Sequence, residues 1–320
     1  MTRARRTRAE IEAFDDAVRD IAERVQPATA RQVYYRSVVA GLVEKDHRGY
    51  RWVVESLVRQ RWSGAVPWSW IADETRAVRA PETWADADRG LAAFARAYRR
   101  DAWRDQPAWV EVWVESDSLA GTLIAETWRL GVPLYSGRGF SSLTALRDAA
   151  EATAERWQER DQGTAILYCG DLDPSGWEAS RAAERGLARH LAELGSADAA
   201  DVLAFRRLAV NPEDVHVYNL PTGAKPKAGK KHRGPGRHHG PGSTSWFAEG
   251  GPGLPFTVEA EAFEPEVLRD LVRGAILEHA DLDALRRAWR VEELERETLA
   301  LVAQRGLTVL GRSGNEESPS

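Results

Sequence analysis

The N-terminal part of the chain carries apolar positions with the period of an α-helix. Apolar side chains recur at steps of three and four residues, which places them on one helix face. In the first helix these are Ile11, Phe14, Val18, Ile21 and Val25. Pro27 ends this helix, because proline lacks the amide hydrogen that a continuing helix needs. Thr29 and Gln32 have the spacing of a capping box, which predicts a second helix from about Ala30 to Leu42.

A third helix is predicted from Tyr50 to Arg61, and residues 64–76 after it fit a short wing or turn. Three compact helices followed by a wing are typical of a winged-helix domain, which binds DNA. Arg51, Arg59 and Arg61 on the third helix would then contact the DNA backbone. The periodicity is equally compatible with a helical packing domain that has no function of its own.

From Trp109 onward the pattern changes, because short apolar runs alternate with amphipathic stretches. The predicted strands are residues 110–116, 132–137, 164–170 and 202–210. The predicted helices between them are residues 118–131, 141–157 and 177–194. Strands that alternate with helices indicate right-handed crossovers and a mainly parallel sheet. The fold class is therefore α/β, with a Rossmann-like sheet.

The predicted elements divide the chain into six parts. They are a winged-helix-like DNA-binding domain (1–80), a helical connector (81–106), the α/β domain (107–215), a basic loop rich in Gly and Pro (216–255), a strand at 256–263 with two helices that complete the α/β domain (256–310), and a disordered tail (311–320). The loop composition cannot form a core, so we expect it to be mobile.

Composition limits the class of protein. A length of 320 residues suits two domains, and no apolar run approaches the roughly 20 residues that span a bilayer. The basic N-terminus is not followed by the apolar segment of a signal peptide. The single cysteine, Cys169, excludes an internal disulfide and a CxxC zinc cluster. We therefore expect a cytoplasmic protein that does not enter a membrane.

The net charge of −5 excludes a uniformly basic nucleic-acid-binding surface, so contacts to DNA must come from local patches. One patch is the arginine-rich segment 1–8, and the other is the segment 222–240, which contains no acidic residue. The cations of the second patch that we expect to contact phosphate include Lys225, Lys227, Lys230, Lys231 and Arg233.

Three acids follow predicted strands of the parallel sheet. Glu115 ends the first strand, Asp171 ends the third, and Asp173 follows at the next turn. Because the carboxyl ends of parallel strands form the ligand crevice, these acids should point into one site. Oxygen ligands without Cys or His suit Mg²⁺, and Mn²⁺ could replace it. The alternative is a plain Asp-rich turn in which Asp173 or Ser175 caps the following helix.

Two further acids, Glu259 and Glu261, lie on one face of the predicted strand 256–263. We interpret this face as solvated. The alternative is that the two side chains add a second metal ligand or a general base.

The segments WVEVWVESDSLAG and, about 55 residues later, ILYCGDLDPSG resemble the Toprim signature, a Glu after one strand and a DxD after a later one. The likeness is greatest to the topoisomerase VI A subunit and the related meiotic double-strand-break transesterase. It extends upstream to ARQVYYR, which resembles the Arg-Asp-x-Tyr-Tyr element of their winged-helix domain. On this match Arg31 falls at the family's arginine and Tyr35 at its nucleophilic tyrosine, whereas Gln32 stands where the family has an acid.

The resemblance implies a Mg²⁺-dependent enzyme that breaks DNA phosphodiester bonds, with Tyr35, Arg31 and Glu115 as catalytic residues and Glu115, Asp171 and Asp173 as metal ligands. It also implies DNA as the partner, and it is compatible with a homodimer and with a separate ATPase subunit, which this sequence does not supply. The rival enzyme is a Toprim nuclease that uses water, with Tyr35 packed in the core. A third hypothesis is a DNA-binding protein without catalysis.

Overall fold

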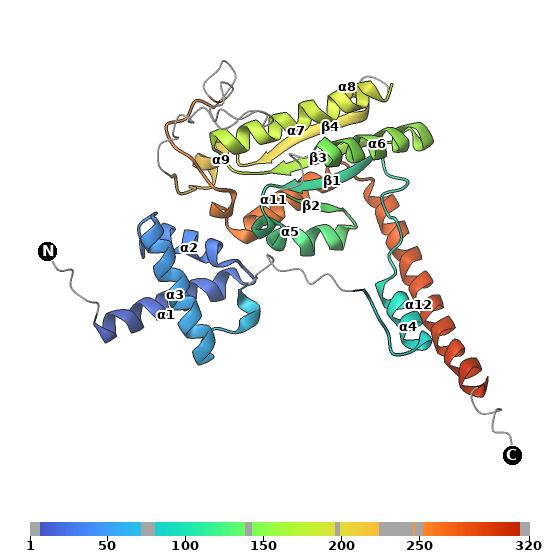
Figure 1. Cartoon of the computed structure of the whole chain (residues 1–320), viewed down its shortest axis with the longest axis horizontal. Helices are drawn as coiled ribbons and strands as arrows, with labels where there is room; N and C mark the ends of the chain where they lie inside the picture. The colour runs from blue at the N-terminus through green and yellow to red at the C-terminus, as the bar shows by residue number, and fades with distance from the viewer. Residues whose placement is uncertain are drawn as a thin grey trace.

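The computed structural model describes residues 7–71, 81–137, 143–195, 199–223, 246 and 252–313. Its N-terminal part is a module of three helices, α1 (Arg8–Val25), α2 (Ala30–Val39) and α3 (His47–Ser63), followed by the short 3-10 helix η1 (Trp68–Trp70) (Figure 1). The side chains of Thr29 and Gln32 form the expected capping box at the start of α2. The third helix starts earlier than predicted because Asp46 caps it through the Gly49 amide.

The remainder is α/β, as the alternation of strands and helices predicted. Its strands are β1 (Ala108–Val114), β2 (Leu134–Ser136), β3 (Gly163–Cys169) and β4 (Leu203–Ala209). They form a parallel sheet in the order β2-β1-β3-β4. The connecting helices are α5 (Asp117–Leu130), α6 (Leu143–Arg160), α7 (Pro174–Glu193) and α8 (Ala199–Val202). The short helix α9 (Pro212–Val217) follows β4.

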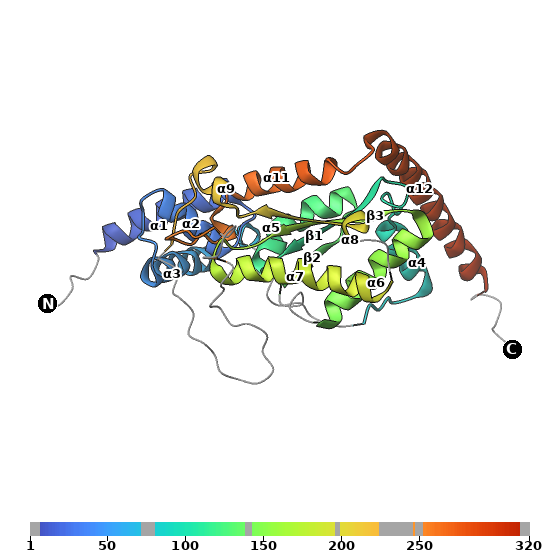
Figure 2. The same cartoon turned by 90° about the horizontal axis from the view of Figure 1, so that it is seen from above.

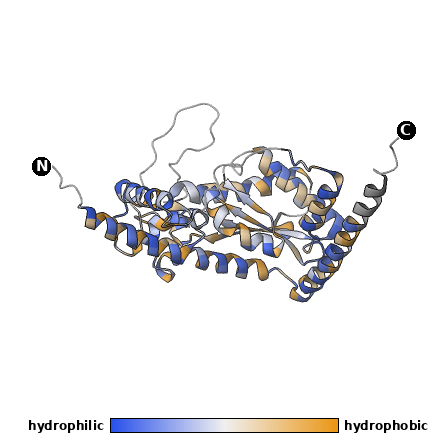
Figure 3. Cartoon of the chain, turned by 90° about the horizontal axis from the view of Figure 1, so that it is seen from below, coloured by the Kyte–Doolittle hydropathy of each residue, from blue (hydrophilic) through white to orange (hydrophobic). Residues whose placement is uncertain are grey.

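Helices cover both faces of the sheet (Figure 2). Alternate side chains of a strand point to opposite faces, so Val112 and Leu167 join the core under α5 and α11, whereas Trp113 and Ile166 join the core under α6 and α7. Figure 3 shows hydrophobic and hydrophilic residues mixed along the outer helices, as expected for helices with one buried face. Because the helices cover the two faces of the sheet, a binding site is expected at the carboxyl ends of its strands.

The C-terminal part contains α11 (Pro265–Leu277) and α12 (Leu282–Ser313). Within the predicted connector 81–106, α4 (Ala87–Ala97) packs along α12, and the pair projects from the body of the molecule (Figure 1). Arg99 and Arg100 form ion pairs of 3.2 and 2.6 Å with Glu292 and Glu295. The helix α12 continues to Ser313, three residues into the tail that was predicted to begin at residue 311.

The strand predicted at 256–263 is also wrong. Val258 forms a single antiparallel bridge with Leu172, through hydrogen bonds of 2.8 and 3.0 Å, and the chain then turns into the 3-10 helix η3 (Ala260–Ala262). The Ala260 amide donates to the Asp171 carboxylate at 2.8 Å instead of to a neighbouring strand. The alternation of apolar and polar residues in this segment therefore belongs to a turn that the Asp171 side chain holds through the Ala260 amide.

The three-helix module docks on the α/β part through polar contacts. The Gln32 side chain donates to the Thr122 hydroxyl at 2.5 Å, and the Ser118 hydroxyl donates to that of Thr29 at 3.1 Å. Arg269 on α11 donates to the carbonyls of Thr122 and Pro27. These contacts fix α2 beside η3 and the sheet edge. None of the helices in the described part of the chain is long and apolar enough to cross a membrane.

Some predictions fall wholly or partly outside the described residues, including the arginine-rich segment 1–8, of which only residues 7 and 8 are described. Within the segment 64–76 predicted as a wing or turn, residues 68–70 form η1 and Ile71 bridges to Ala28, but residues 72–76 lie outside the described ranges. The basic segment 222–240 is described only at residues 222 and 223, so the proposed phosphate contacts of Lys225, Lys227, Lys230, Lys231 and Arg233 lie outside the described residues.

Candidate acidic site and tyrosine cavity

The acids Glu115 and Asp171 meet at the carboxyl ends of two neighbouring strands. Val114 of β1 lies opposite Cys169 of β3 in the parallel register, so the residues that follow each strand emerge side by side. The Glu115 amide donates to the Cys169 carbonyl at 3.0 Å, and the Asp171 amide donates to Oε2 of Glu115 at 2.8 Å. The structure thus brings together two residues that are far apart in the sequence.

Asp173 serves as the N-cap of α7. Its Oδ1 accepts hydrogen bonds from the Gly176 amide at 2.7 Å and from the Ser175 hydroxyl at 2.8 Å. The structure therefore contains the capping arrangement that the sequence offered as an alternative. Capping does not remove Asp173 from the acidic site, because its charge still acts on Glu115.

Glu261 of η3 is the fourth acid of this site, and the interpretation of a solvated strand face is wrong for it. Its side chain is buried, with 3% exposure, and it accepts a hydrogen bond of 3.0 Å from the Ser116 hydroxyl. A carboxylate buried beside Glu115 and Asp171 adds repulsion between like charges at this site. The sequence signal was the two-residue spacing of Glu259 and Glu261.

The burial and close approach of the carboxylates raise their pKa values. Burial, followed by repulsion from Glu261 and Glu115, raises the pKa of Asp171 well above that of an ordinary aspartate. Burial also raises the pKa of Glu115, and the charge of Asp173 adds to this, while the hydrogen bond from the Asp171 amide opposes it. Each neutral form is favoured because burial disfavours the charged form and nearby like charges repel it.

The chemistry of this site fits a hard divalent cation, although the described side chains do not form a finished metal centre. Across the described ranges, no three Asp, Glu, His or Cys side chains form a group that could hold a metal ion. The donors present are carboxylate oxygens, which Mg²⁺ prefers. Glycines let the backbone pack closely against one of these carboxylates, because a Cβ at Gly170 or Gly176 would come within 2.7 or 2.9 Å of Oε2 of Glu115.

Arg207 of β4 holds the turn that carries Asp171. Its guanidinium donates to the carbonyls of Gly170, Asp171 and Gly176, and it lies between the rings of Tyr168 and Trp177. Burial lowers the pKa of Arg207, and the surrounding anionic groups oppose this effect. Sequence reasoning missed this residue, although a charged residue inside a parallel strand is an unusual feature.

Tyr35 lines a cavity of about 390 Å³ near the acidic site. The tyrosine is 2% exposed, and the cavity is also lined by Arg31, Lys45 and Glu259. Arg31 pairs with Glu259 at 2.7 Å, and Nζ of Lys45 lies 5.1 Å from the centroid of the Tyr35 ring. Neither Lys45 nor the pairing of Glu259 was anticipated from the sequence.

Electrostatics connects this cavity to the acidic site. Burial and a hydrogen bond to Glu259 raise the pKa of Tyr35, and the charge of Arg31 opposes them. Burial lowers the pKa of Lys45, while the charges of Glu259 and Asp171 oppose it. The cations and the phenol of the cavity therefore lie within the field of the strand-end acids.

The arginines of α3 divide into different roles. Arg59 pairs with Asp15 of α1 at 2.6 Å, so it joins two helices instead of being free to contact DNA. Arg51 is exposed and lies 3.6 Å from Glu55 in the next turn. Arg61 stacks on the ring of Trp68, with its Cζ 4.2 Å from the ring centroid.

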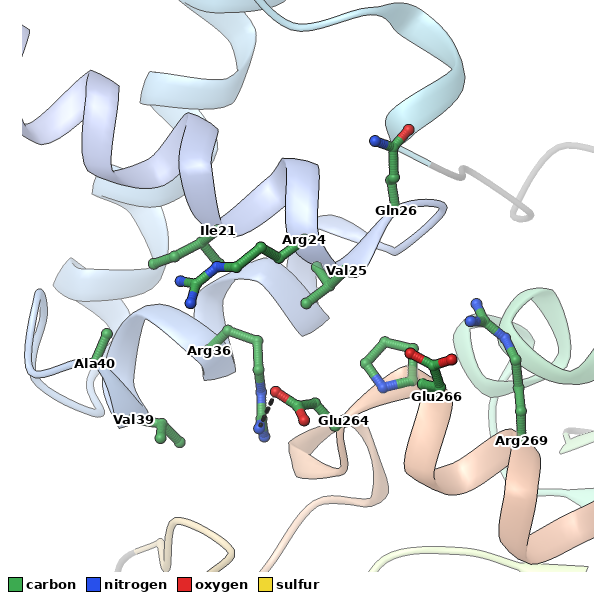
Figure 4. Close-up of a pocket in the computed structure, with 11 residues that line it drawn as sticks. Ile21, Arg24, Val25, Gln26, Arg36, Val39, Ala40, Glu264, Glu266 and Arg269 are labelled. Carbon is green, nitrogen blue, oxygen red and sulfur yellow. Dashed lines mark ion pairs between the residues drawn. The ribbon is translucent and has the colours of Figure 1, made fainter.

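Another cavity, of about 370 Å³, lies between the three-helix module and α11 (Figure 4). Figure 4 shows Arg36 pointing from α2 toward Glu264, with which it pairs at 3.6 Å. Arg269 on the opposite side is engaged by backbone carbonyls. This cavity contains none of the strand-end acids, so it is a joint between the two parts and a weaker candidate for catalysis.

Comparison of the chain with protein-family models, with curated proteins and with solved structures finds no match. Function is therefore inferred from the geometry and chemistry of the site itself.

Proposed function

We propose that this protein is a Mg²⁺-dependent enzyme that breaks phosphodiester bonds in DNA, with a Toprim-type α/β domain and a winged-helix-like N-terminal module. The observation that carries the proposal is the hydrogen bond from the Asp171 amide to the Glu115 carboxylate, at the same sheet edge on which Tyr35, Arg31 and Glu259 are docked. Acids, a cation and a potential nucleophile gathered at strand ends are the parts that phosphate transfer requires.

The metal would be held by Glu115, Asp171 and Asp173, and Mn²⁺ could replace Mg²⁺. The bound ion would supply Lewis-acid stabilisation of the charge that develops on phosphate. Asp173 would act as a ligand through the oxygen that does not accept the capping hydrogen bond. Arg207 would keep the Asp171 turn in place through its backbone contacts.

In the transesterase form of the proposal, the Tyr35 oxygen bonds to phosphorus as the P–O bond to a DNA sugar breaks, and the sugar oxygen takes a proton from solvent and leaves as a hydroxyl. Glu259 is placed to take the phenol proton, and Arg31 holds that carboxylate in position. The raised pKa of Tyr35 means that the resting side chain is a neutral phenol, so attack has to be coupled to this proton transfer.

The second candidate is a nuclease in which water attacks and Tyr35 is structural. It is favoured by the burial of Tyr35, which packs against Tyr34 with ring centroids 5.1 Å apart. A DNA-binding protein without catalysis is the third candidate. In all three, DNA is the partner, and a homodimer or a separate ATPase subunit would be an additional component.

The deciding experiment incubates the full chain with supercoiled plasmid in Mg²⁺, Mn²⁺ or EDTA and stops the reaction with denaturant. We expect the protein to nick or linearise the plasmid in Mg²⁺ or Mn²⁺ but not in EDTA. A covalent protein–DNA adduct that is lost in Tyr35→Phe but not in Tyr34→Phe would support the transesterase. Cleavage retained in Tyr35→Phe would support the water-using nuclease. No cleavage under any of these conditions would contradict the proposed enzyme.

A further inference from the structure

A pair of exposed tryptophans at the end of α3 is not explained by the acidic site. Trp62 is 78% exposed and Trp68 is 56% exposed, and their rings meet edge to face with centroids 5.6 Å apart and an interplanar angle of 89°. Indole rings are usually buried for most of their area, so two adjacent exposed rings indicate a surface that binds something.

The chemistry around the pair favours nucleic acid. Arg61 covers one face of Trp68, and at the other end of the same helix Arg48 lies 4.2 Å from the ring centroid of Trp52. Helix α3 carries four arginines against one acid, Glu55. Aromatic rings interleaved with arginines bind bases by stacking and phosphates by charge.

A ridge of side chains links the tyrosine cavity to this pair. Tyr50, Val54, Val58 and Trp62 lie four residues apart along α3, so they form one gradually winding row on the helix surface. Tyr50 lines the cavity that contains Tyr35. At about 1.5 Å per residue, the row from Tyr50 to Trp62 spans roughly 18 Å. That length matches about five stacked nucleotides at about 3.4 Å each.

We propose that the α3–η1 surface, defined by Tyr50, Val58, Trp62, Trp68 and Arg61, binds unpaired bases of single-stranded DNA by stacking. The inference rests on the proposed function and deepens it, because it names a substrate with an unpaired segment instead of an intact duplex. The strand would run along α3 from the Trp62–Trp68 pair toward the tyrosine cavity. Bases inside a duplex are stacked on each other and cannot cover these rings.

Binding is measured in EDTA, so that no cleavage occurs, by fluorescence anisotropy of the full chain with three labelled ligands. These are a 20-nucleotide oligothymidine, the same strand with abasic sites in place of its bases, and a duplex of the same length. We expect the oligothymidine to bind most tightly and to quench tryptophan fluorescence. The abasic strand has the same phosphate charge, so weaker binding to it isolates the contribution of the bases.

The variants are Trp62→Ala and Trp68→Ala, with Trp128→Ala as the matched control. Trp128 on α5 is 71% exposed and lies outside the proposed surface. Each test variant should bind oligothymidine about tenfold more weakly, whereas the control should bind like the wild type. Unchanged thermal midpoints would verify that each variant is folded.

Three results would overturn the inference: equal binding of the abasic strand, tighter binding of the duplex, or Trp62→Ala and Trp68→Ala behaving like the control. An effect of these variants on self-association without any effect on DNA would instead identify a protein-docking surface. Failure of the proposed enzyme is a separate outcome. If binding of oligothymidine depends on Trp62 but the protein shows no metal-dependent cleavage, the proposed enzyme is rejected and the DNA-binding surface is supported. If the protein cleaves DNA but the tryptophan variants bind oligothymidine like the wild type, the surface is rejected and the enzyme is supported.

Discussion

Arg207 offers the sharpest test of how the acidic turn is supported. Its guanidinium donates to the carbonyls of Gly170, Asp171, Gly176 and Val210 and to the Ser180 hydroxyl. These bonds hold the residues on both sides of the Asp171–Asp173 segment against β4. Replacement by Gln would remove most of these hydrogen bonds, although the Gly170 carbonyl would keep its bond from the Val210 amide at 2.8 Å.

The expected cost follows from these contacts. A hydrogen bond from a charged donor contributes about 1.5–3 kcal/mol, but the removal of a buried charge recovers part of the desolvation penalty. We therefore expect Arg207→Gln to lower the free energy of unfolding by about 3–5 kcal/mol, the range for breaking a buried charged network. At about 2–4 °C per kcal/mol, the thermal midpoint should fall by roughly 6–20 °C.

The neighbouring residue supplies the control for Arg207→Gln. Arg206 is on the same strand, is half exposed, and pairs with Glu278 on the surface at 2.6 Å. Arg206→Gln should cost less than about 1 kcal/mol, because surface ion pairs are weak. Urea unfolding followed by circular dichroism measures both variants. If Arg207→Gln costs no more than Arg206→Gln, the turn is not held by Arg207 and its role as a positioning residue is refuted.

Three further predictions concern the acids and their turn. Asp171→Asn should abolish metal-dependent nicking while leaving the protein folded, and retained activity there and in Glu115→Gln would reject the metal site. The pKa of Asp171 is raised on folding, so the folded state binds more protons than the unfolded state. The free energy of unfolding should therefore fall as pH rises above the ordinary aspartate pKa near 3.8. Asp171→Asn should reduce this pH dependence when unfolding is measured from pH 3.5 to 8. Gly176→Ala should lower stability by about 1–3 kcal/mol, because its Cβ would lie 2.6 Å from the Asp171 carbonyl oxygen, whereas Gly274→Ala on α11 meets open space and should be neutral or stabilising.

Much of the fold was accessible from the sequence because local signals agree with tertiary packing. The capping box of Thr29 and Gln32 marks the start of α2, and Gly131 in a left-handed conformation ends α5. The parallel sheet follows from apolar runs such as residues 164–170, since strands buried on both faces are apolar throughout. The meeting of Glu115 and Asp171 follows from the shared direction of parallel strands.

The rest depends on contacts between segments that are remote in sequence. The stretch 256–263 alternates like a strand, but only Val258 finds a partner, and the Asp171 side chain takes the Ala260 amide. The packing of α4 on α12 joins segments about 200 residues apart, and no local pattern specifies that pairing. Arg207 could not be assigned because its partners are backbone carbonyls, which every sequence contains.

The two parts of the chain are joined in a way that would make the proposed chemistry depend on their docking. Tyr35 and Arg31 belong to α2, whereas Glu259 and the strand-end acids belong to the α/β part. The Gln32 side chain caps α2 and also reaches Thr122, so one residue sets both the start of the helix and its distance from the sheet. An ionised acid at position 32 would accept hydrogen bonds but could not donate one to a hydroxyl as the Gln32 amide does. The glutamine is therefore suited to a module held firmly against the sheet. Both forms of the proposed reaction then begin with Tyr35 already beside Glu259, and they differ only in whether its hydroxyl or a water molecule attacks.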